Sequence, residues 1–399
     1  MYPDSLENFW LARALATTGT ATHEDALDQL RPAVQRLSDL FTVERPGNAF
    51  PDYAADPALL TAYGLFFFPQ SFVRARIALD QPLRFRGWRP AARPDGVPVR
   101  ILDLGSGTGP CGLAAALALR ELAPDTPQIL TALDHSPAAL ATLRQLAPTL
   151  PGPALAVETH ATDLRCARTN ALPPQDLILA GFAANELFGS DPEALRRWLA
   201  TLRARLAPGG LLLVLEPALH DTATTLQNAA DALAATGAFH HWAPGLSTVR
   251  SALTGEASRK FWNHEVRRWH APASLEFLNR RLFRDISVLK FAYVALGTAT
   301  PPPLPHLPSP MRLVSPLEPL KAHLICAVED AQGTRLTLEI PARGFSKSEI
   351  KAIAASWERG DIFGVHEMQA LGQKNYFRLP GTDALIPLYR FASASSSLQ

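Results

Sequence analysis

The sequence predicts an α/β protein: a doubly wound, mostly parallel sheet, an N-terminal helical region and a small C-terminal β-rich (α+β) domain. Five short apolar runs alternate with helix-like segments, at residues 99–102, 129–133, 155–157, 177–180 and 211–215. Runs that are apolar throughout are typical of parallel strands with helices on both faces. A proline-rich stretch at 300–310 then indicates a linker between two domains.

Residues 1–95 are the predicted helical region. Apolar side chains recur there at helical spacing, at Ala26, Leu27, Leu30, Val34, Leu37 and Leu40. A second helical segment, 57–79, carries a group of aromatic residues that we expect in the core. Pro69 lies inside this segment, and we expect it to break or kink the helix because proline has no N–H to donate.

The predicted sheet domain spans residues 96–299, with a last strand at 288–296 and a basic insertion at about 240–285. The small domain spans 311–399. In it, apolar runs at 322–328 and 334–340 flank a turn and predict a β-hairpin. A helix is expected at 346–359 with Ser346 as its cap, and the last residues, 392–399, are expected to be a loose tail.

Composition indicates an ordinary globular protein, with 47% hydrophobic and 19% charged residues and a net charge of +1. The net charge gives no argument for nucleic acid. The three cysteines, Cys111, Cys166 and Cys326, are far apart and lack metal-ligand spacing, so no metal site is predicted. No apolar run is long enough to cross a membrane and the N-terminus does not resemble a signal peptide, so we expect a cytoplasmic protein without membrane partners.

The most informative motif follows the first apolar run: Asp103-x-Gly105-x-Gly107-x-Gly109, with Ser106 and Thr108 between the glycines. Glycines let a chain turn sharply and approach a ligand closely. Asp103 would repel a pyrophosphate, so the motif suits a cationic or amine-bearing ligand. Gly107-x-Gly109-x-x-Gly112 also fits the dinucleotide fingerprint, but it begins too late, because that fingerprint should start where the strand ends.

Other candidate residues also follow apolar runs, where ligands of parallel sheets bind. Asp134 ends the second run, followed by His135, and its carboxylate can accept both hydroxyl hydrogens of a ribose. Asp163 and Leu164 follow the third run and offer an acceptor beside an apolar wall. Asn185 and Glu186 follow the fourth, and they either orient a substrate, with Glu186 as general base, or only start a helix.

Together these motifs resemble class I S-adenosylmethionine-dependent methyltransferases. The resemblance implies a Rossmann-like methyltransferase sheet and S-adenosylmethionine as cofactor, lying across Gly105–Gly109 with Asp134 at its ribose. It also implies Asp163 near the adenine amine. The polar-proline-aromatic motif with which many amino-methylating members hold the target nitrogen is missing after the fourth run, which counts against base N-methylation.

A narrower resemblance is to the small-ribosomal-subunit methyltransferase-like family of bacteria and mitochondria. It rests on the segment from Ala62 to Phe72, on Asn185-Glu186-Leu187 and on Trp262-Asn263-His264-Glu265. This resemblance implies association with the small ribosomal subunit or its RNA. Many members carry a cysteine within Trp-Cys-His-Glu that suits an iron–sulfur cluster, whereas this chain has Asn263, so we expect no cluster.

Three functions follow as hypotheses. The first is a methyltransferase that acts on, or assembles with, small-subunit ribosomal RNA. The alternatives are a non-catalytic ribosome assembly factor and a small-molecule methyltransferase in which residues 1–95 form a lid. An RNA-facing surface is expected in segment 250–290, unless its tryptophans are core and its arginines only solvate the surface. Its candidate residues are Arg259, Lys260, Phe261, Trp262, Arg267, Arg268, Trp269, Arg280, Arg281 and Arg284, joined by Lys347, Lys351 and Arg359 of the small domain.

Overall fold

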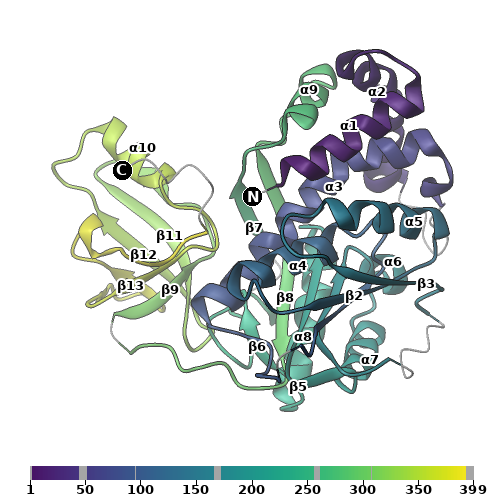
Figure 1. Ribbon diagram of the computed structural model, residues 1–399. Helices are drawn as coiled ribbons and strands as arrows, with labels where there is room; N and C mark the ends of the chain where they lie inside the picture. The colour runs from purple at the N-terminus through teal and green to yellow at the C-terminus, as the bar shows by residue number, and fades with distance from the viewer. Residues whose placement is uncertain are drawn as a thin grey trace.

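The computed structural model describes residues 2–44, 52–94, 96–165, 172–255, 261–306 and 308–391. Cys166, Arg259, Lys260 and the tail expected at 392–399 lie outside these residues. The described chain forms two lobes that lie side by side (Figure 1). The larger lobe contains the helical region and the first sheet, and the smaller lobe contains the second sheet.

The large-lobe sheet has the strand order β3-β2-β1-β4-β5-β8-β6, with β7 paired to β8. Its strands are β1 (Val99–Leu104), β2 (Gln128–Asp134), β3 (Ala156–Ala161), β4 (Gln175–Gly181), β5 (Leu206–Glu216), β6 (His240–Ala243), β7 (Glu265–Arg268) and β8 (Val288–Gly297). Strands β1 to β5 are parallel, and β8 runs antiparallel to β5. The predicted parallel-rich, Rossmann-like sheet is therefore confirmed. The order reverses at β1, so the ends of β1 and β4 form the switch point where such sheets bind ligands.

Helices cover both faces of this sheet because its strands are apolar on both sides. Ile101 of β1 belongs to the core on the side of α3 and α4, whereas Leu102 belongs to the core on the side of α7 and α8. The covering helices are α3 (Pro57–Asp80), α4 (Pro110–Leu122), α5 (Pro137–Leu146), α7 (Pro192–Arg203) and α8 (His220–Ala235). The third strand is longer than its apolar run because β3 is an edge strand with exposed positions.

The helical region consists of α1 (Asp4–Thr18), α2 (His23–Asp39) and α3, with α9 (Ala273–Arg281) packed against them. The expected break at Pro69 is wrong: α3 continues through it to Asp80. Pro69 is buried in a helix that packs on α1, α2 and α4, and this packing outweighs the missing hydrogen bond. Gly64 is the crossing point with α1, since a Cβ there would lie 2.0 Å from the Trp10 ring.

The smaller lobe is a mostly antiparallel sheet with the order β14-β15-β12-β11-β9-β13-β16 and β10 paired to β11. Its elements are β9 (Ser309–Leu313), β10 (Glu318–Leu320), β11 (His323–Asp330), β12 (Arg335–Pro341), α10 (Lys347–Ala355), β13 (Ile362–Val365), β14 (Gln369–Ala370), β15 (Tyr376–Arg378) and β16 (Ile386–Tyr389). Strands β11 and β12 are the expected hairpin. Helix α10 begins with a capping box at Ser346 but ends earlier than expected.

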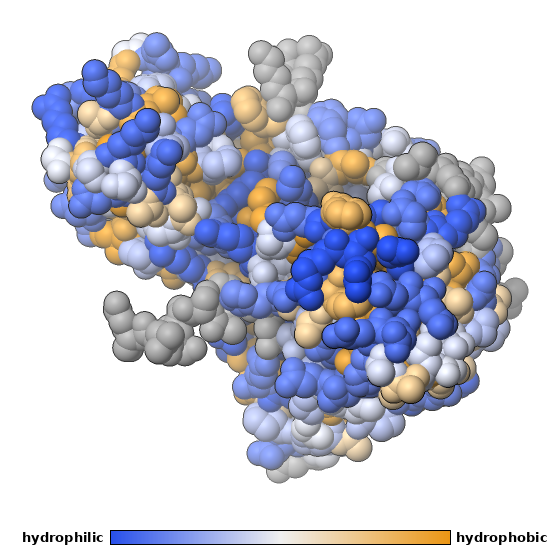
Figure 2. All heavy atoms as spheres, turned by 90° about the horizontal axis from the view of Figure 1, so that it is seen from above, coloured by the Kyte–Doolittle hydropathy of each residue, from blue (hydrophilic) through white to orange (hydrophobic). Residues whose placement is uncertain are grey.

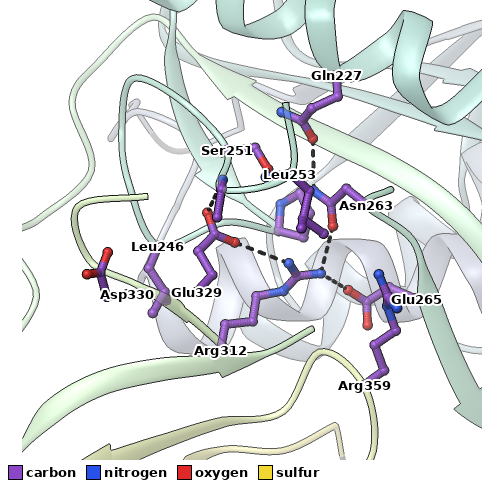
Figure 3. A network of polar contacts seen from close by, with 12 residues as sticks. Gln227, Leu246, Ser251, Leu253, Asn263, Glu265, Arg312, Glu329, Asp330 and Arg359 are labelled. Atoms are coloured by element: carbon purple, nitrogen blue, oxygen red, sulfur yellow. Dashed lines mark hydrogen bonds and ion pairs between the residues drawn. The ribbon is translucent and has the colours of Figure 1, made fainter. Parts of the chain in front are cut away.

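A buried polar network joins the lobes (Figure 3). Arg312 of β9, with a side chain that is 0% exposed, donates to Glu329 of its own lobe and to Glu265 and Asn263 of the large lobe. Arg267 of the large lobe pairs with Glu265 and with Asp361 of the small lobe. We call these six residues the lobe joint.

The lobe joint corrects part of the expected RNA-facing surface. Arg267 is 3% exposed, so it cannot face RNA, and Trp269 belongs to the core. Arg359 is also used internally, because its guanidinium donates to the carbonyl oxygens of Trp262 and His264. Arg268 is exposed but donates to Glu358 at 2.6 Å. The mixed surface seen from above in Figure 2 is largely polar, with scattered apolar side chains.

Candidate functional site

The glycine motif forms the turn between β1 and α4. Gly105, Gly107 and Gly109 all have positive φ angles, of 69°, 52° and 83°. A Cβ on Gly105 would lie 2.5 Å from the Cβ of Ala183, and a Cβ on Gly109 would lie 2.3 Å from Leu143. The turn therefore needs glycine at all three positions for its backbone conformation, and at Gly105 and Gly109 for close packing as well.

Asp103 lies beneath this turn and is only 1% exposed. Its Oδ2 accepts the N–H of Gly112, in the first turn of α4, at 2.8 Å, while Oδ1 has no partner among the described residues. Burial raises the pKa of Asp103 to about 7, and the charge of Asp134 adds to this. Asp103 therefore ties the strand to the helix and offers one free acceptor from below.

Asp134, at the end of β2, is bonded to the same turn. Its carboxylate accepts the N–H of Gly107 at 2.7 Å and the N–H of Ser136 at 2.9 Å. His135 is more exposed, and its Nδ1 lies 3.4 Å from Asp134 Oδ1. A carboxylate has about four acceptor positions, so Asp134 retains capacity for two hydroxyl groups beside the turn.

Asp163 and Leu164 follow β3, and they differ in their surroundings. The carboxylate of Asp163 is exposed and accepts the N–H of Arg165 at 2.9 Å. Leu164 is half-buried, and its Cδ1 lies 3.5 Å from the position of a Cβ on Gly105. Leu164 therefore supplies an apolar wall next to the glycine turn.

Asn185 and Glu186 lie in α6 (Ala184–Phe188), which follows β4 after a sharp turn with Phe182 at φ 62°. Neither residue caps this short helix. Glu216, at the end of β5, does so instead, because its Oε1 accepts the N–H groups of Ala184 at 2.9 Å and Asn185 at 3.2 Å. The sequence analysis did not single out Glu216, because its hold on the α6 backbone depends on how β5 and α6 come together in the fold.

Two more carboxyl groups at this edge are hard to ionise. Burial raises the pKa of Glu216 to about 8, and it raises the pKa of Glu186 to about 7 with a contribution from Asp134. Glu186 nevertheless keeps an exposed surface. A carboxyl that is both accessible and desolvated can take or give a proton near neutral pH.

The helical region covers this edge of the sheet, and of the residues involved only Tyr63 belongs to the aromatic group that was expected in the core. Tyr53 stacks on Tyr63 of α3, with ring centroids 5.3 Å apart. Burial raises the pKa of both tyrosines, and the charges of Asp134 and Glu186 raise it further. Further along α3, the guanidinium carbon of Arg74 lies 5.6 Å from the ring centroid of Phe182. Helical spacing from Tyr63 to Arg74 could have indicated this stripe.

Five buried side-chain oxygens around the turn have no hydrogen-bond partner among the described residues. They are Asp103 Oδ1, Ser106 Oγ, Thr108 Oγ1, Asn185 Oδ1 and Glu216 Oε2. Buried polar groups in folded proteins are nearly always hydrogen-bonded. Their concentration at the switch point indicates a binding site for a ligand with hydroxyl or amine donors. We call the ends of β1, β2, β4 and β5, together with Tyr53, Tyr63 and Arg74 of the helical region, the strand-end site.

No group of three or more His, Cys, Asp or Glu side chains in the described part of the chain could hold a metal ion. No helix there is long and apolar enough to cross a membrane.

No protein-family model matches the sequence, and no curated protein does either. Among solved structures, a putative class I S-adenosylmethionine-dependent methyltransferase from Listeria monocytogenes is 12% identical, covers 75% of this chain and 90% of its own, and has a TM-score of 0.36. An S-adenosylmethionine-dependent methyltransferase from Clostridium acetobutylicum is 16% identical over 37% of this chain and 50% of its own, with a TM-score of 0.27. TrmN from Thermus thermophilus is 26% identical over 37% and 41%, with a TM-score of 0.26.

The chain thus spans half or less of the length of the last two structures. Overall superposition is limited in all three, so the fold assignment rests on the strand order, the direction of β8 and the glycine turn.

Proposed function

We propose that the protein binds S-adenosylmethionine at the strand-end site and is a methyltransferase. The observation that carries this proposal is the glycine turn at the switch point with carboxylates on both sides, Asp103 below it and Asp134 bonded to Gly107. In this proposal the donor lies across Gly105–Gly109, with Ser106 and Thr108 as polar contacts. Asp134 and His135 face its ribose, and Asp163 and Leu164 face its adenine.

The charge of the site supports a cationic ligand over a dinucleotide. Asp103, Glu186 and Glu216 each have a raised pKa because of desolvation and a neighbouring carboxylate, and none of them has an ion-pair partner among the described residues. A sulfonium or ammonium group beside them would favour their ionised forms. A pyrophosphate in the same place would meet three carboxyl groups and the Asp134 carboxylate, and it would be repelled.

In a methyl transfer the protein mainly has to orient the donor and the acceptor. S-adenosylmethionine supplies an electrophilic methyl group for an in-line displacement, and orientation provides most of the rate enhancement. Glu216 orients Asn185 by accepting its backbone N–H. Asn185 Oδ1 is a free acceptor for a hydrogen of the methyl-accepting group. Glu186, with a pKa of about 7, takes up the proton that the acceptor loses.

Isothermal titration calorimetry tests the donor assignment. We expect the wild-type protein to bind S-adenosylmethionine, and Asp134→Ala to lose about 10- to 100-fold in affinity with the hydrogen bonds to the ribose. Asp221→Ala, at an exposed carboxylate of α8, is the matched control and should bind normally. The proposal would be overturned if the wild-type protein bound NAD but did not bind S-adenosylmethionine. Unchanged affinity in Asp134→Ala would remove the ribose assignment.

For the acceptor, we propose small-subunit ribosomal RNA, and this step rests on the sequence resemblance alone. A methylation map of ribosomal RNA from cells with and without the gene tests it. A lost mark supports the enzyme. Identical maps with accumulated immature subunits support the assembly factor instead, and identical maps with normal subunits support a small-molecule acceptor. Among the expected RNA contacts, Arg280 is exposed, whereas Arg281 already pairs with Asp28 at 3.2 Å.

A further inference from the structure

Arg74 is a largely buried cation that has no ion-pair partner among the described residues. Its Nη2 donates to Gln70 Oε1 at 3.2 Å, and its guanidinium carbon lies over the Phe182 ring. Its Nε is buried without a partner, and no carboxylate pairs with it among the described residues. By contrast, Arg76, two residues further along α3, makes an ion pair with Glu121 at 2.6 Å.

The surroundings of Arg74 make this arrangement costly for the free protein. Desolvation lowers the pKa of Arg74 to about 10, so the side chain is still charged at neutral pH. Part of it remains accessible to solvent. A buried charge with one neutral hydrogen-bond partner destabilises a fold unless something else compensates. An anionic ligand that binds Arg74 would compensate this charge.

The position of Arg74 relative to the strand ends identifies which end of a ligand it would meet. Phe182 follows β4, whereas Asp134 ends β2, and β1 with its glycine turn lies between them. Neighbouring strands are about 4.8 Å apart, so the ends of β2 and β4 are separated by about 10 Å across the turn. Cys111 in the first turn of α4 fills the space next to Gly181, below Arg74.

We propose that Arg74 binds the α-carboxylate of the methionine part of the donor, an inference that rests on the proposed function. An extended donor with its ribose at Asp134 runs over the glycine turn and brings its carboxylate toward β4. The donor carries two cationic groups and one anionic group. Its sulfonium and ammonium meet the carboxyl groups of the strand-end site, and its carboxylate meets Arg74. The Phe182 ring holds the guanidinium plane in place by stacking.

Titration of two ligands into three proteins tests this assignment. The ligands are S-adenosylmethionine and its decarboxylated analogue, which lacks only the carboxylate. The proteins are wild type, Arg74→Met and Arg76→Met, the last being the control from the same helix. We expect wild type to bind S-adenosylmethionine about 10- to 100-fold more tightly than the analogue, because a charge-assisted hydrogen bond to a carboxylate is lost. Arg74→Met should lose that preference and bind the analogue as wild type does.

Thermal unfolding of the ligand-free proteins checks the folding of the variants. Because Arg74→Met removes an uncompensated charge, it should unfold at the wild-type temperature or above it. Wild-type affinity for S-adenosylmethionine in Arg74→Met would overturn the assignment. Equal weakening of both ligands would also overturn it. If wild type binds neither ligand, the proposed function itself fails, which is a distinct result.

Discussion

The strand-end site and the lobe joint both contain buried carboxyl groups, but the pKa values of these groups are shifted in opposite directions at Asp103 and Glu265. At the lobe joint, burial alone would raise the pKa of Glu265, yet Arg267 and Arg312 hold it below its ordinary value. At the strand-end site, burial raises the pKa of Asp103 to about 7, and the charge of Asp134 adds to this. The ion pairs of the lobe joint connect two lobes, whereas Asp103, Glu186 and Glu216 have no ion-pair partner among the described residues.

The largest effect should come from breaking the lobe joint. Arg312→Met removes the cation between Glu265 and Glu329 and leaves two carboxylates buried without it. We expect a loss of about 3–5 kcal/mol in the free energy of unfolding, measured by denaturant titration. Arg268→Met, at an exposed pair with Glu358, is the control and should cost about 0–1 kcal/mol. Equal costs for the two variants would contradict the structural role of the joint.

Replacing one carboxylate by its amide should change the free energy of unfolding in opposite directions in the two regions. Glu265→Gln leaves two buried arginines short of charge and should destabilise the protein by about 2–4 kcal/mol. Glu216→Gln keeps an oxygen that accepts the N–H groups of Ala184 and Asn185 and removes a desolvated charge. It should stabilise the ligand-free protein by about 1–3 kcal/mol above pH 8. Denaturant titrations at pH 8.5 measure both, and the same sign for both variants would refute the comparison.

The two regions should also respond differently to pH. The folded-state pKa values of Asp103, Glu186 and Glu216 lie above those of the unfolded chain, at about 7, 7 and 8. Their contribution to stability is therefore fully present below about pH 4 and is lost as the pH rises to about 8. A cationic donor favours their ionised forms, so its affinity should rise over pH 6–8.

Thermal unfolding with and without S-adenosylmethionine, from pH 5 to pH 9, measures this response. The temperature shift caused by the donor should grow with pH in wild type and grow less in Glu186→Gln, which cannot ionise at that position. A shift that stays constant across this range would show that these carboxyl groups do not sense the donor.

The smallest effect concerns Asn263, which belongs to the lobe joint. Its Nδ2 donates to Gln227 at 2.8 Å, and its Oδ1 accepts from Arg312 at 3.1 Å. Asn263→Ala should cost about 1–3 kcal/mol, since two buried polar groups lose a partner. Gln373→Ala, at an exposed side chain, should change stability by less than about 0.5 kcal/mol. An unaffected Asn263→Ala would mean that this amide does not contribute to the lobe joint.

The sequence by itself determined the sheet, the glycine turn and the hairpin, because these depend on local patterns. Apolar runs mark strands buried on both faces, and Gly105, Gly107 and Gly109 mark a turn that other residues would strain. The same local reasoning was wrong at Pro69, where packing of α3 on its neighbours outweighs the local preference. It also did not give the antiparallel direction of β8, which depends on the route of the whole chain.

Only the tertiary structure decided which charges are paired. Arg74 and Arg267 both lie in segments rich in arginine, and the sequence does not show which of them meets a carboxylate of another element. Arg267 meets Asp361 of the other lobe, whereas Arg74 meets the Phe182 ring and no carboxylate among the described residues. The contribution of a charged side chain to stability depends on its burial and on partners that are far away in the sequence. Such partners come together only when the chain has folded.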